Sequence, residues 1–447
     1  MLGALALTAN AQTIAPAPVN QPYGKVDLAD LQMTSCDFEK DANAEVLINT
    51  ADTYFDQNFG IVVEYHKRIK IFNDNGKKEA DVHKKYINDN GYEFITGLQA
   101  ETINLVDGKP VITKLDKKQV FTKVLDKDHN ELVFTMPDVK PGCIIDYKYT
   151  WNTKAFYNMP NWFFQADIPV RYSEIKTEIP DYFYFRANPR NLMHIDQEVN
   201  TIDTRTLSTP DGPLTYNVNI EKRVITNIHS LPEEPLMSSF ADNVQCIFFQ
   251  LVNIKPTYGF TQTYSDSWSR VGGILIDDDD FGGQLKRKLD KEEDIVNKAK
   301  ALKTDDEKIA YIFSAVKNTM KWNGIDEYYT NDGTSKAWQT KTGNSAEINI
   351  ILYHLLKQVG IEAYPMVVST REHGKVIPFY TSLAQFNRAV VYIPVDSTKR
   401  YFLDASGKYN VYNETPEELL NSSGLFIDKP KEEYDIVFLK RVTRQGR

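Results

Sequence analysis

The sequence is poor in cysteine, and its cysteines are not spaced for a metal site. The 447 residues include only Cys36, Cys143 and Cys246, which are scattered and form no Cys-x-x-Cys pair. A metal centre built on cysteine is therefore not expected. We expect three buried small hydrophobic side chains, with a single disulfide after export as the alternative. No cofactor and no metal ion is predicted.

Long apolar runs and an excess of positive charge are also missing. No apolar run after the N-terminus is long enough to span a bilayer, so no transmembrane segment is expected. The 52 Lys and Arg against 61 Asp and Glu give a formal charge of −9. Nucleic-acid binding needs a basic stripe, so no nucleic-acid partner is expected. The length predicts two or three domains.

The first residues are typical of the end of a secretory signal. Leu2 to Thr8 form a short apolar run, and Ala9-Asn10-Ala11 fits the cleavage pattern. Residues 1–11 are therefore interpreted as a signal remnant, although the basic region that opens such signals is missing. We expect an exported protein, most simply periplasmic, with secretion or attachment to the cell envelope as alternatives.

Residues 12–230 are predicted to form an antiparallel β-sandwich. The stretch 61–72 is rich in β-branched and aromatic residues and ends at an Asn-Asp-Asn-Gly turn. A second turn lies at 106–109, and 143–149 is another strand pattern. Strands at this spacing, with few helix signals between them, favour a sandwich.

A cluster of aromatic residues stands out in this region. We expect it to belong to the core or rim of the sandwich, as is common for such side chains. A face that binds sugars or peptides is the alternative. The cluster comprises Trp151, Phe156, Tyr157, Trp162, Phe163 and Phe164.

The pattern changes at the proline-containing stretch 231–235, which opens a predicted linker over 231–264. Apolar stripes at helical spacing then predict helices over 306–322 and 345–359. Asn344 and Glu347 match a capping box at the start of the second helix, and Gly360 matches the residue after its end.

Three strands are predicted after these helices, at 363–368, 389–393 and 401–404. Helices followed by strands indicate an α+β domain, which we place at 265–430. Residues 431–447 read as the start of a further β element, and we expect the natural protein to continue beyond them. No internal repeat is present.

Four stretches resemble motifs of the bacterial transglutaminase-like superfamily, whose core is papain-like. They are Gly343 to Glu347 at the helix start, Gly360 to Tyr364, Phe386 to Arg388, and Tyr401 to Ala405. Upstream, Tyr65 to Lys70, Gln99 to Ile103 and Met136 to Gly142 resemble an uncharacterised β domain. That domain commonly precedes transglutaminase-like domains in envelope proteins.

The resemblance places Ser345 at the nucleophile position, Arg388 at the base position and Asp404 at the position of the orienting acid. The family carries Cys, His and Asp there, so two of three residues are replaced. A serine hydroxyl needs a base, and a guanidinium stays protonated with a pKa above about 12. The expectation is a pseudoenzyme with an inactive triad.

Other residues could still contribute to chemistry or binding. His373 follows the predicted strand in a loop and is the best candidate for a replacement base. Gln339 lies six residues before Ser345, where papain-like enzymes place an oxyanion-hole side chain, although a local capping role is the simpler reading. Asn387 and Trp338 are further candidate groove residues, and Trp322 is expected beside them.

Arg388 and Asp404 allow two structural readings. The simpler is an ion pair across neighbouring strands. The alternative is an anion pocket in which Arg388 and the helix N-terminus hold a carboxylate. The acidic run 277–280 lacks the spacing of a calcium-binding loop and is expected to be a solvated loop.

Three functions remain open at this point. The first is a non-catalytic envelope protein that binds peptide, protein or glycan. The second is an active hydrolase or acyltransferase that uses Ser345 with an unusual base such as His373. The third is a structural spacer in a larger assembly, for which a filled groove would be evidence. The sequence gives neither a ligand nor an oligomeric state.

Overall fold

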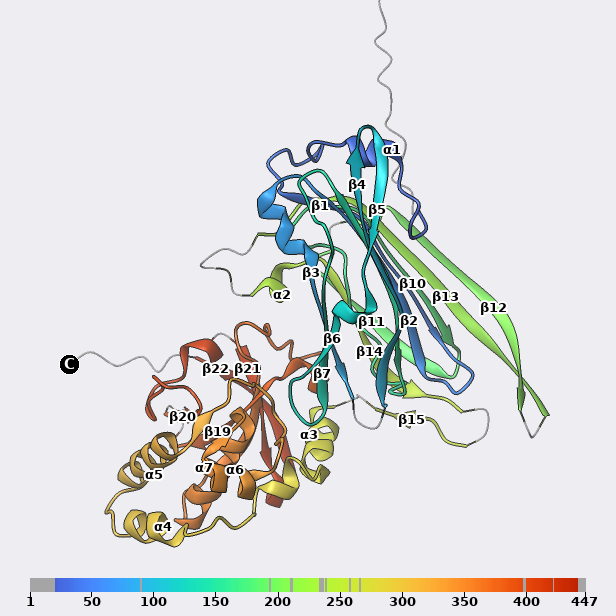
Figure 1. Cartoon of the computed structure of the whole chain (residues 1–447). Coiled ribbons are helices and arrows are strands. Elements are labelled where there is room, and N and C mark those ends of the chain that lie inside the picture. Colours follow the sequence, from blue (N-terminus) through green and yellow to red (C-terminus); the bar gives the residue numbers. More distant parts are fainter. Residues whose placement is uncertain are drawn as a thin grey trace, which may run out of the picture.

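A computed structural model describes residues 21–440, apart from 89–90, 193, 210–211, 233–236, 238, 257–258, 265–266, 397–398 and 421. The signal interpretation for residues 1–11 and the end of the chain at 441–447 lie outside the described residues. The chain is mostly β-structure and forms a β domain followed by a further domain, seen at the lower left of Figure 1.

The β domain is organised around an eight-stranded sheet in the order β12-β13-β10-β1-β2-β8-β4-β5. Neighbouring strands are antiparallel except β1 and β10, which run parallel, so the expectation of a purely antiparallel sandwich is wrong at this pair. The strands are β1 Ala44–Phe55, β2 Ile61–Ile71, β4 Glu93–Val106, β5 Lys109–Lys114, β8 Ile144–Thr153, β10 Val170–Pro180, β12 Gln197–Thr209 and β13 Gly212–Ile228.

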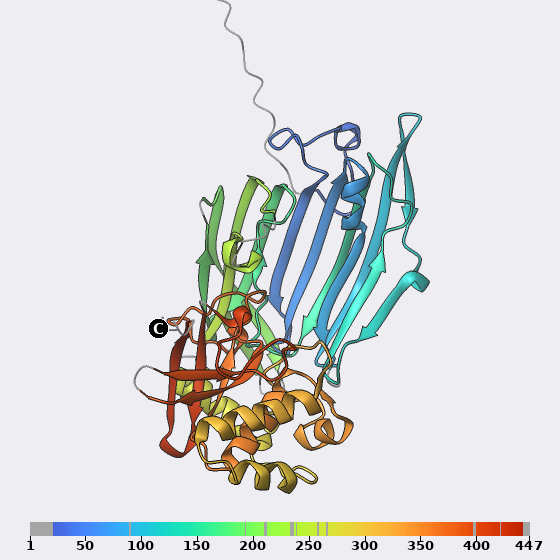
Figure 2. The same ribbon diagram turned by 90° about the vertical axis from the view of Figure 1, so that its left-hand side faces the viewer.

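Two smaller sheets cover one face of the large sheet (Figure 2). One has the order β3-β7-β6, and the other joins β11, β14 and β15, with β9 also paired to β14. A single apolar core includes residues from all three sheets. The strands are β3 Asp81–Ile87, β6 Val120–Val124, β7 His129–Thr135, β9 Trp162–Phe163, β11 Phe183–Arg190, β14 Cys246–Ile254 and β15 Gln262–Thr263.

Strand β2 illustrates how the sequence positions this core. Side chains alternate between the two faces of a strand, so Ile61, Val63, Ile69 and Ile71 all point into the core. The opposite face is covered at one end by the short helix α1, Leu28–Gln32, and the residues before it. There Arg68 is buried and donates hydrogen bonds to Asp146 and to the Pro22 carbonyl.

The segment 231–264, expected as a linker, instead contains strand β14 of the second small sheet. β14 pairs with β11 from Phe183↔Ile254 to Arg190↔Cys246. Helix α2, Phe240–Asn243, precedes it. Tyr264 packs on the apolar core of the β domain and Trp268 on the core of the second domain, so the change of domain falls between these two residues.

The second domain has a five-stranded antiparallel sheet in the order β20-β19-β18-β21-β22. The strands are β18 Tyr364–Val368, β19 Arg388–Pro394, β20 Arg400–Leu403, β21 Ser422–Asp428 and β22 Glu433–Leu439. The three strands expected from the sequence are present. β22 completes the sheet, so the stretch expected as the start of a further β element belongs to this domain.

Five helices pack with one face of this sheet (Figure 1). Alternate residues such as Val367, Ala389 and Val391 face the helices, while Met366 and Val390 lie in a small cluster on the opposite face. The helices are α3 Trp268–Asp277, α4 Glu293–Lys300, α5 Asp305–Thr319, α6 Thr334–Thr340 and α7 Ser345–Gln358.

Helix α7 is the central element of the second domain. The expected capping box is formed, since the Asn344 side chain accepts from the Glu347 amide and the Glu347 side chain accepts from the Asn344 amide. Gly360 follows the helix with φ 84°, a backbone conformation that favours glycine. Most of the helix is buried, including Leu355.

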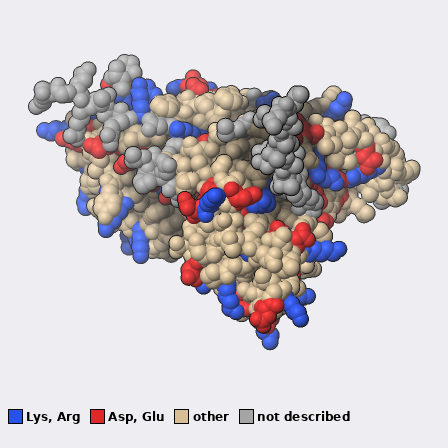
Figure 3. Space-filling model, turned by 90° about the horizontal axis from the view of Figure 1, so that it is seen from above, with Lys and Arg blue, Asp and Glu red and all other residues tan. Residues whose placement is uncertain are grey.

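Three further observations are not confined to one domain. Cys36, Cys143 and Cys246 are buried free thiols, as expected. Among the helices in the described ranges, none has the length and apolar character needed to cross a membrane. On the face shown in Figure 3, acidic and basic side chains are interspersed rather than gathered by sign.

Replacing Leu355 by alanine tests the central role of α7. Leu355 is fully buried in the core between α5, α7 and the sheet, so we expect the free energy of unfolding to fall by about 2–5 kcal/mol. Lys357→Ala, at an exposed position of the same helix, should change it by no more than about 0.5 kcal/mol. Denaturant titration followed by circular dichroism measures both, and equal effects would contradict this assignment of the core.

Candidate functional site

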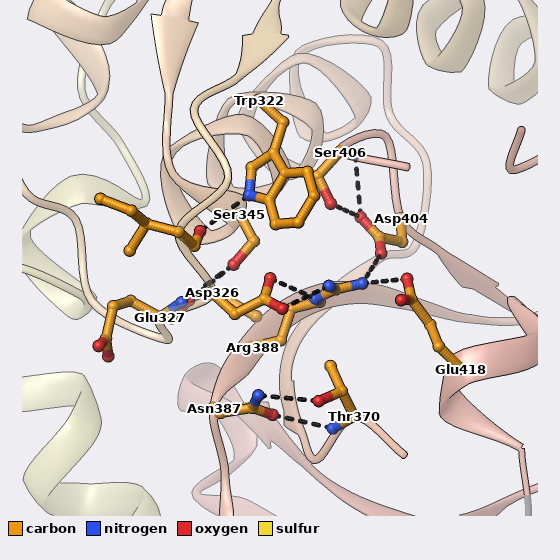
Figure 4. A network of polar contacts seen from close by, with 12 residues as sticks. Trp322, Asp326, Glu327, Ser345, Thr370, Asn387, Arg388, Asp404, Ser406 and Glu418 are labelled. Atoms are coloured by element: carbon orange, nitrogen blue, oxygen red, sulfur yellow. Dashed lines mark hydrogen bonds and ion pairs between the residues drawn. The ribbon is translucent and has the colours of Figure 1, made fainter. Parts of the chain in front are cut away.

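Ser345 is the first residue of α7 and is completely buried. Its amide donates to the Ile325 carbonyl at 3.2 Å. Its hydroxyl donates to the Glu327 carbonyl at 3.0 Å and accepts from the Glu327 amide at 3.1 Å (Figure 4). Both hydrogen bonds of the hydroxyl are therefore with the main chain of Glu327. The Glu327 carbonyl cannot act as a base for Ser345.

The main chain that contacts Ser345 belongs to residues 323–330, which we call the covering segment. Besides the Ile325 and Glu327 contacts, the Tyr329 carbonyl accepts from the Asn344 side chain at 2.8 Å. Trp322, immediately before the segment, donates from its indole nitrogen to the Ile325 carbonyl at 2.8 Å. The start of α7, where an anion or substrate could bind, is thus occupied by the chain itself.

Arg388 begins β19 and is held by three carboxylates (Figure 4). It binds both oxygens of Asp326, with Nε–Oδ1 at 2.9 Å and Nη2–Oδ2 at 2.7 Å. Nη1 donates to Asp404 Oδ2 at 2.9 Å and also to Glu418. The guanidinium is buried and lies over Trp322, with its carbon 5.7 Å from the ring centre.

The charges around Arg388 bear on its role as a base and on the anion-pocket reading. Burial lowers the pKa of Arg388, but Asp404, Asp326 and Glu418 together raise it above its usual value. Arg388 is therefore not a base. Three carboxylates facing one guanidinium also leave the site without an excess positive charge, so the anion-pocket reading is not supported. The cross-strand ion pair between Arg388 and Asp404 is present.

Asp404 follows β20 and is fully enclosed by donors. Its Oδ1 accepts from the Asn349 side chain at 2.8 Å, the Ser406 amide at 2.9 Å and the Ser406 hydroxyl at 2.5 Å. Its Oδ2 accepts from Arg388. Asn349 lies one helical turn after Ser345 on α7, and its side-chain oxygen also accepts from the Ala405 amide at 2.8 Å. The network joins the helix, two strands and the loop after β20.

His373 does not serve Ser345. Its Nδ1 is hydrogen-bonded to the Ser369 hydroxyl at 2.9 Å, and the Ser345 hydroxyl is bonded to Glu327 instead. Burial lowers the pKa of His373, and a hydrogen bond that its ring donates to the Gln385 backbone acts in the opposite direction. The residue supports the loop after β18, so this candidate for a replacement base is not bonded to Ser345.

The remaining candidate residues are Asn387, Trp338 and Gln339. Asn387 exchanges two hydrogen bonds with Thr370, at 2.8 and 2.9 Å. Trp338 is buried in the helical core and donates to the Asp290 carbonyl at 2.8 Å. Gln339 is exposed on α6, without a recorded side-chain hydrogen bond in the described part of the chain.

Most partners in this network have no signal in the sequence. Asp326 and Glu327 lie in an irregular segment and Glu418 in a short 3₁₀ helix, and no local pattern indicates that they meet Arg388 or Ser345. The position of Asn349 could have been predicted. It lies four residues after Ser345, and residues four apart on a helix share a face.

Glu327 also contacts the β domain. Its carboxylate lies near Asp126 and His129, at the loop between β6 and β7, and the three offer ligand-type atoms within 4.8 Å of one another. This set could hold a metal ion, but Asp126 already accepts from the His129 ring and amide. The second such set, Cys36, Asp37 and Glu45, has both its carboxylates paired with Arg171.

The neighbouring Lys127 completes this contact between the domains. It donates from Nζ to Asp280 at 2.8 Å and from its amide to Asn331 at 2.9 Å. Part of the acidic run 277–280 therefore pairs with the β domain rather than with solvent alone.

Comparison with known proteins adds two findings. Residues 58–209 match a family described as a domain of unknown function with a solved structure, DUF3857. The whole fold is similar to the crystal structure of a "putative protease" from Parabacteroides distasonis, with a TM-score of 0.61 and 14% sequence identity. That match covers 89% of this chain and 72% of the other, and at this identity it concerns the fold alone. No curated protein matches the chain.

Replacing Arg388 by methionine tests the network energetically. Three carboxylates would lose their counter-ion, one of them fully buried, so we expect the free energy of unfolding to fall by about 3–5 kcal/mol at pH 8. The loss should shrink at pH 5, because protonation relieves the uncompensated charge. Arg400→Met in neighbouring β20 is the control and should cost about 0.5 kcal/mol. A comparable loss in both variants, by denaturant titration, would contradict the role given to Arg388.

Replacing Glu327 by glutamine tests the contact between the domains. Burial raises the pKa of Glu327 to about 7, with Asp126 and Asp326 adding to the rise and His129 opposing it. The folded protein thus holds this proton more tightly than the unfolded chain, and the resulting stability is lost as pH rises toward 7. Between pH 5 and pH 8 the free energy of unfolding of the wild type should fall by up to about 3 kcal/mol relative to that of Glu327→Gln.

The control for this measurement is Glu417→Gln, at an exposed position. Its stability, measured by urea titration across the same pH range, should run parallel to that of the wild type. If the stability of Glu327→Gln also changed with pH in parallel with that of the wild type, the proton would not be held at Glu327.

Proposed function

We propose that this chain is an exported, non-catalytic relative of transglutaminase-like proteins that acts by binding rather than by covalent chemistry. The observation that carries the proposal is the state of Ser345. Its side chain is fully buried, and its hydroxyl is hydrogen-bonded on both sides to the main chain of Glu327. A nucleophile must instead be accessible and bonded to a base.

The residue at the base position supports the same proposal. Arg388 stays charged and is held by Asp326, Asp404 and Glu418. A transglutaminase-like triad needs an imidazole there to take and return a proton. In this chain the position serves an ion-pair network that joins the covering segment to the sheet. The triad-equivalent residues thus stabilise the domain, which is the role proposed for them.

The proposed division of the chain starts from 12–230 as the β domain and 265–430 as the transglutaminase-like domain. Two observations favour extending both. β14 pairs within the β domain, and β22 pairs within the sheet of the second domain. Since β15 also pairs with β14, we therefore propose a β domain to about residue 264 and a transglutaminase-like domain from about 268 to 439.

Within this proposal, the protein works in the cell envelope, most simply in the periplasm, and binds peptide, protein or glycan. Export rests on the Ala9-Asn10-Ala11 pattern. The covering segment fills the start of α7, so the second domain supplies a scaffold and the β domain the binding surface. A purely structural spacer is the competing outcome. An active hydrolase has less support, because His373 is bonded to Ser369.

Chemical labelling tests the absence of catalysis. The native protein, treated with a serine-reactive fluorophosphonate and analysed by intact mass, should show no adduct at Ser345. A Ser345→Cys variant should resist iodoacetamide beyond the background of the wild-type cysteines when folded, and take up one further equivalent when denatured. The reason is that the side chain is enclosed by the covering segment.

The control is Ser345→Ala, which must match the wild type in its circular dichroism spectrum and in its labelling. Fluorophosphonate labelling of the wild type that disappears in Ser345→Ala would refute the non-catalytic proposal.

A further inference from the structure

A cavity of about 280 Å³ lies inside the β domain, away from Ser345. Its floor is the covered face of the large sheet, where Ala51, Tyr65 and Tyr149 lie side by side on β1, β2 and β8. Its walls come from the edges of the two smaller sheets, with Lys84 on β3 and Trp162 on β9. The cavity therefore lies between the two small sheets.

The lining carries positive charge without any negative charge. Lys67 and Lys84 both contribute, while no Asp or Glu is among the lining residues. In a chain with a formal charge of −9, this is a local reversal of sign. Neither ammonium group forms an ion pair or a hydrogen bond with the part of the chain that the structure describes. Lys84 instead lies against Trp151, with Nζ 5.3 Å from the ring centre.

Burial of the same two lysines favours the binding of an anion beside them. It lowers the pKa of Lys67, although Glu79 and Asp167 act in the opposite direction. It also lowers the pKa of Lys84, against the effect of Glu93. A bound anion would offset the cost of burying these charges.

Three further lining residues have unused hydrogen-bonding atoms. The indole nitrogens of Trp151 and Trp162 and the hydroxyl of Thr53 are buried without a partner among the described residues. An indole N–H and a lysine ammonium can only donate. Unsatisfied donors cost free energy, so the two lysines of the lining are matched to a ligand that supplies acceptors.

The remaining lining limits the ligand's size and shape. Tyr65, Tyr149, Trp151 and Trp162 supply flat apolar surfaces. Small-molecule sites are commonly apolar with a few placed polar groups and start at about 300 Å³, so this cavity suits a compact ligand. Asn161 and Phe163, both exposed, line it on the solvent side.

We propose that this cavity binds a small organic carboxylate with an aromatic body, either as a free acid or as the C-terminal residue of a peptide. The carboxylate contacts Lys67 and Lys84, and the ring lies against the aromatic lining. The site is separate from the Ser345 site, so the inference holds whether or not the second domain is catalytic. It gives a function to part of the aromatic cluster recognised in the sequence.

The first experiment uses the wild-type chain labelled with 5-fluorotryptophan. Its five tryptophans give separate fluorine NMR signals, assigned by Trp→Phe variants. Titration with N-acetylphenylalanine should shift the signals of Trp151 and Trp162 and leave those of Trp322 and Trp338 in place. N-acetylphenylalanine amide, which lacks the charge, should bind at least tenfold more weakly. The peptide Ala-Ala-Phe distinguishes the two sources, because binding as tight as that of the single residue indicates a peptide C-terminus.

The second experiment measures affinity in variants by calorimetry. Lys84→Met and Lys67→Met should each weaken N-acetylphenylalanine binding at least tenfold. Lys85→Met is the matched control, because Lys85 is the next residue on β3, is exposed and does not line the cavity, and its affinity should equal that of the wild type. Circular dichroism establishes that each variant is folded.

Three results would overturn the proposal. They are no shift of Trp151 or Trp162 with either carboxylate, equal binding of the acid and its amide, and unchanged affinity in folded Lys67→Met and Lys84→Met. The fluorine signals come from the wild type, so the proposal stays testable even if a lysine variant does not fold.

Discussion

The buried guanidinium of Arg388 is the interaction on which the site of the second domain depends. It contacts carboxylates from three separate segments: Asp326 in the covering segment, Asp404 after β20 and Glu418 in the loop before β21. A buried charge is tolerated only when it is paired and hydrogen-bonded. Each segment is thereby fixed relative to β19, and the covering segment is held over the start of α7.

That arrangement links Ser345 to Arg388. With arginine at 388, Asp326 is drawn to the guanidinium, and the next residue, Glu327, is positioned to bond the Ser345 hydroxyl. A serine at 345 fits this role because it can donate to and accept from the same main chain. The pair therefore stabilises a closed helix N-terminus, whereas an acyl-transfer site would need it open.

The sequence predicted what depends on local pattern. The capping box at Asn344, the apolar stripe of α7 and the glycine at 360 each act within a few residues, and all three are present. The parallel pairing of β1 with β10 and the pairing of β14 with β11 could not be foreseen, because they join segments far apart in the chain. The same holds for Asp326 and Glu418, which are far from Arg388 in the sequence and meet it only in the folded domain.

The architecture of the second domain does not depend on a catalytic residue. The stability of the second domain comes from α7 packing on β19 and from the network around Asp404, in which Asn349 and Ser406 supply donors that do not depend on catalysis. Selection for a stable scaffold would preserve these contacts without a nucleophile. Binding specificity can then lie elsewhere: in the β domain, Lys67 and Lys84 line a cavity and form no ion pair or hydrogen bond with the described residues.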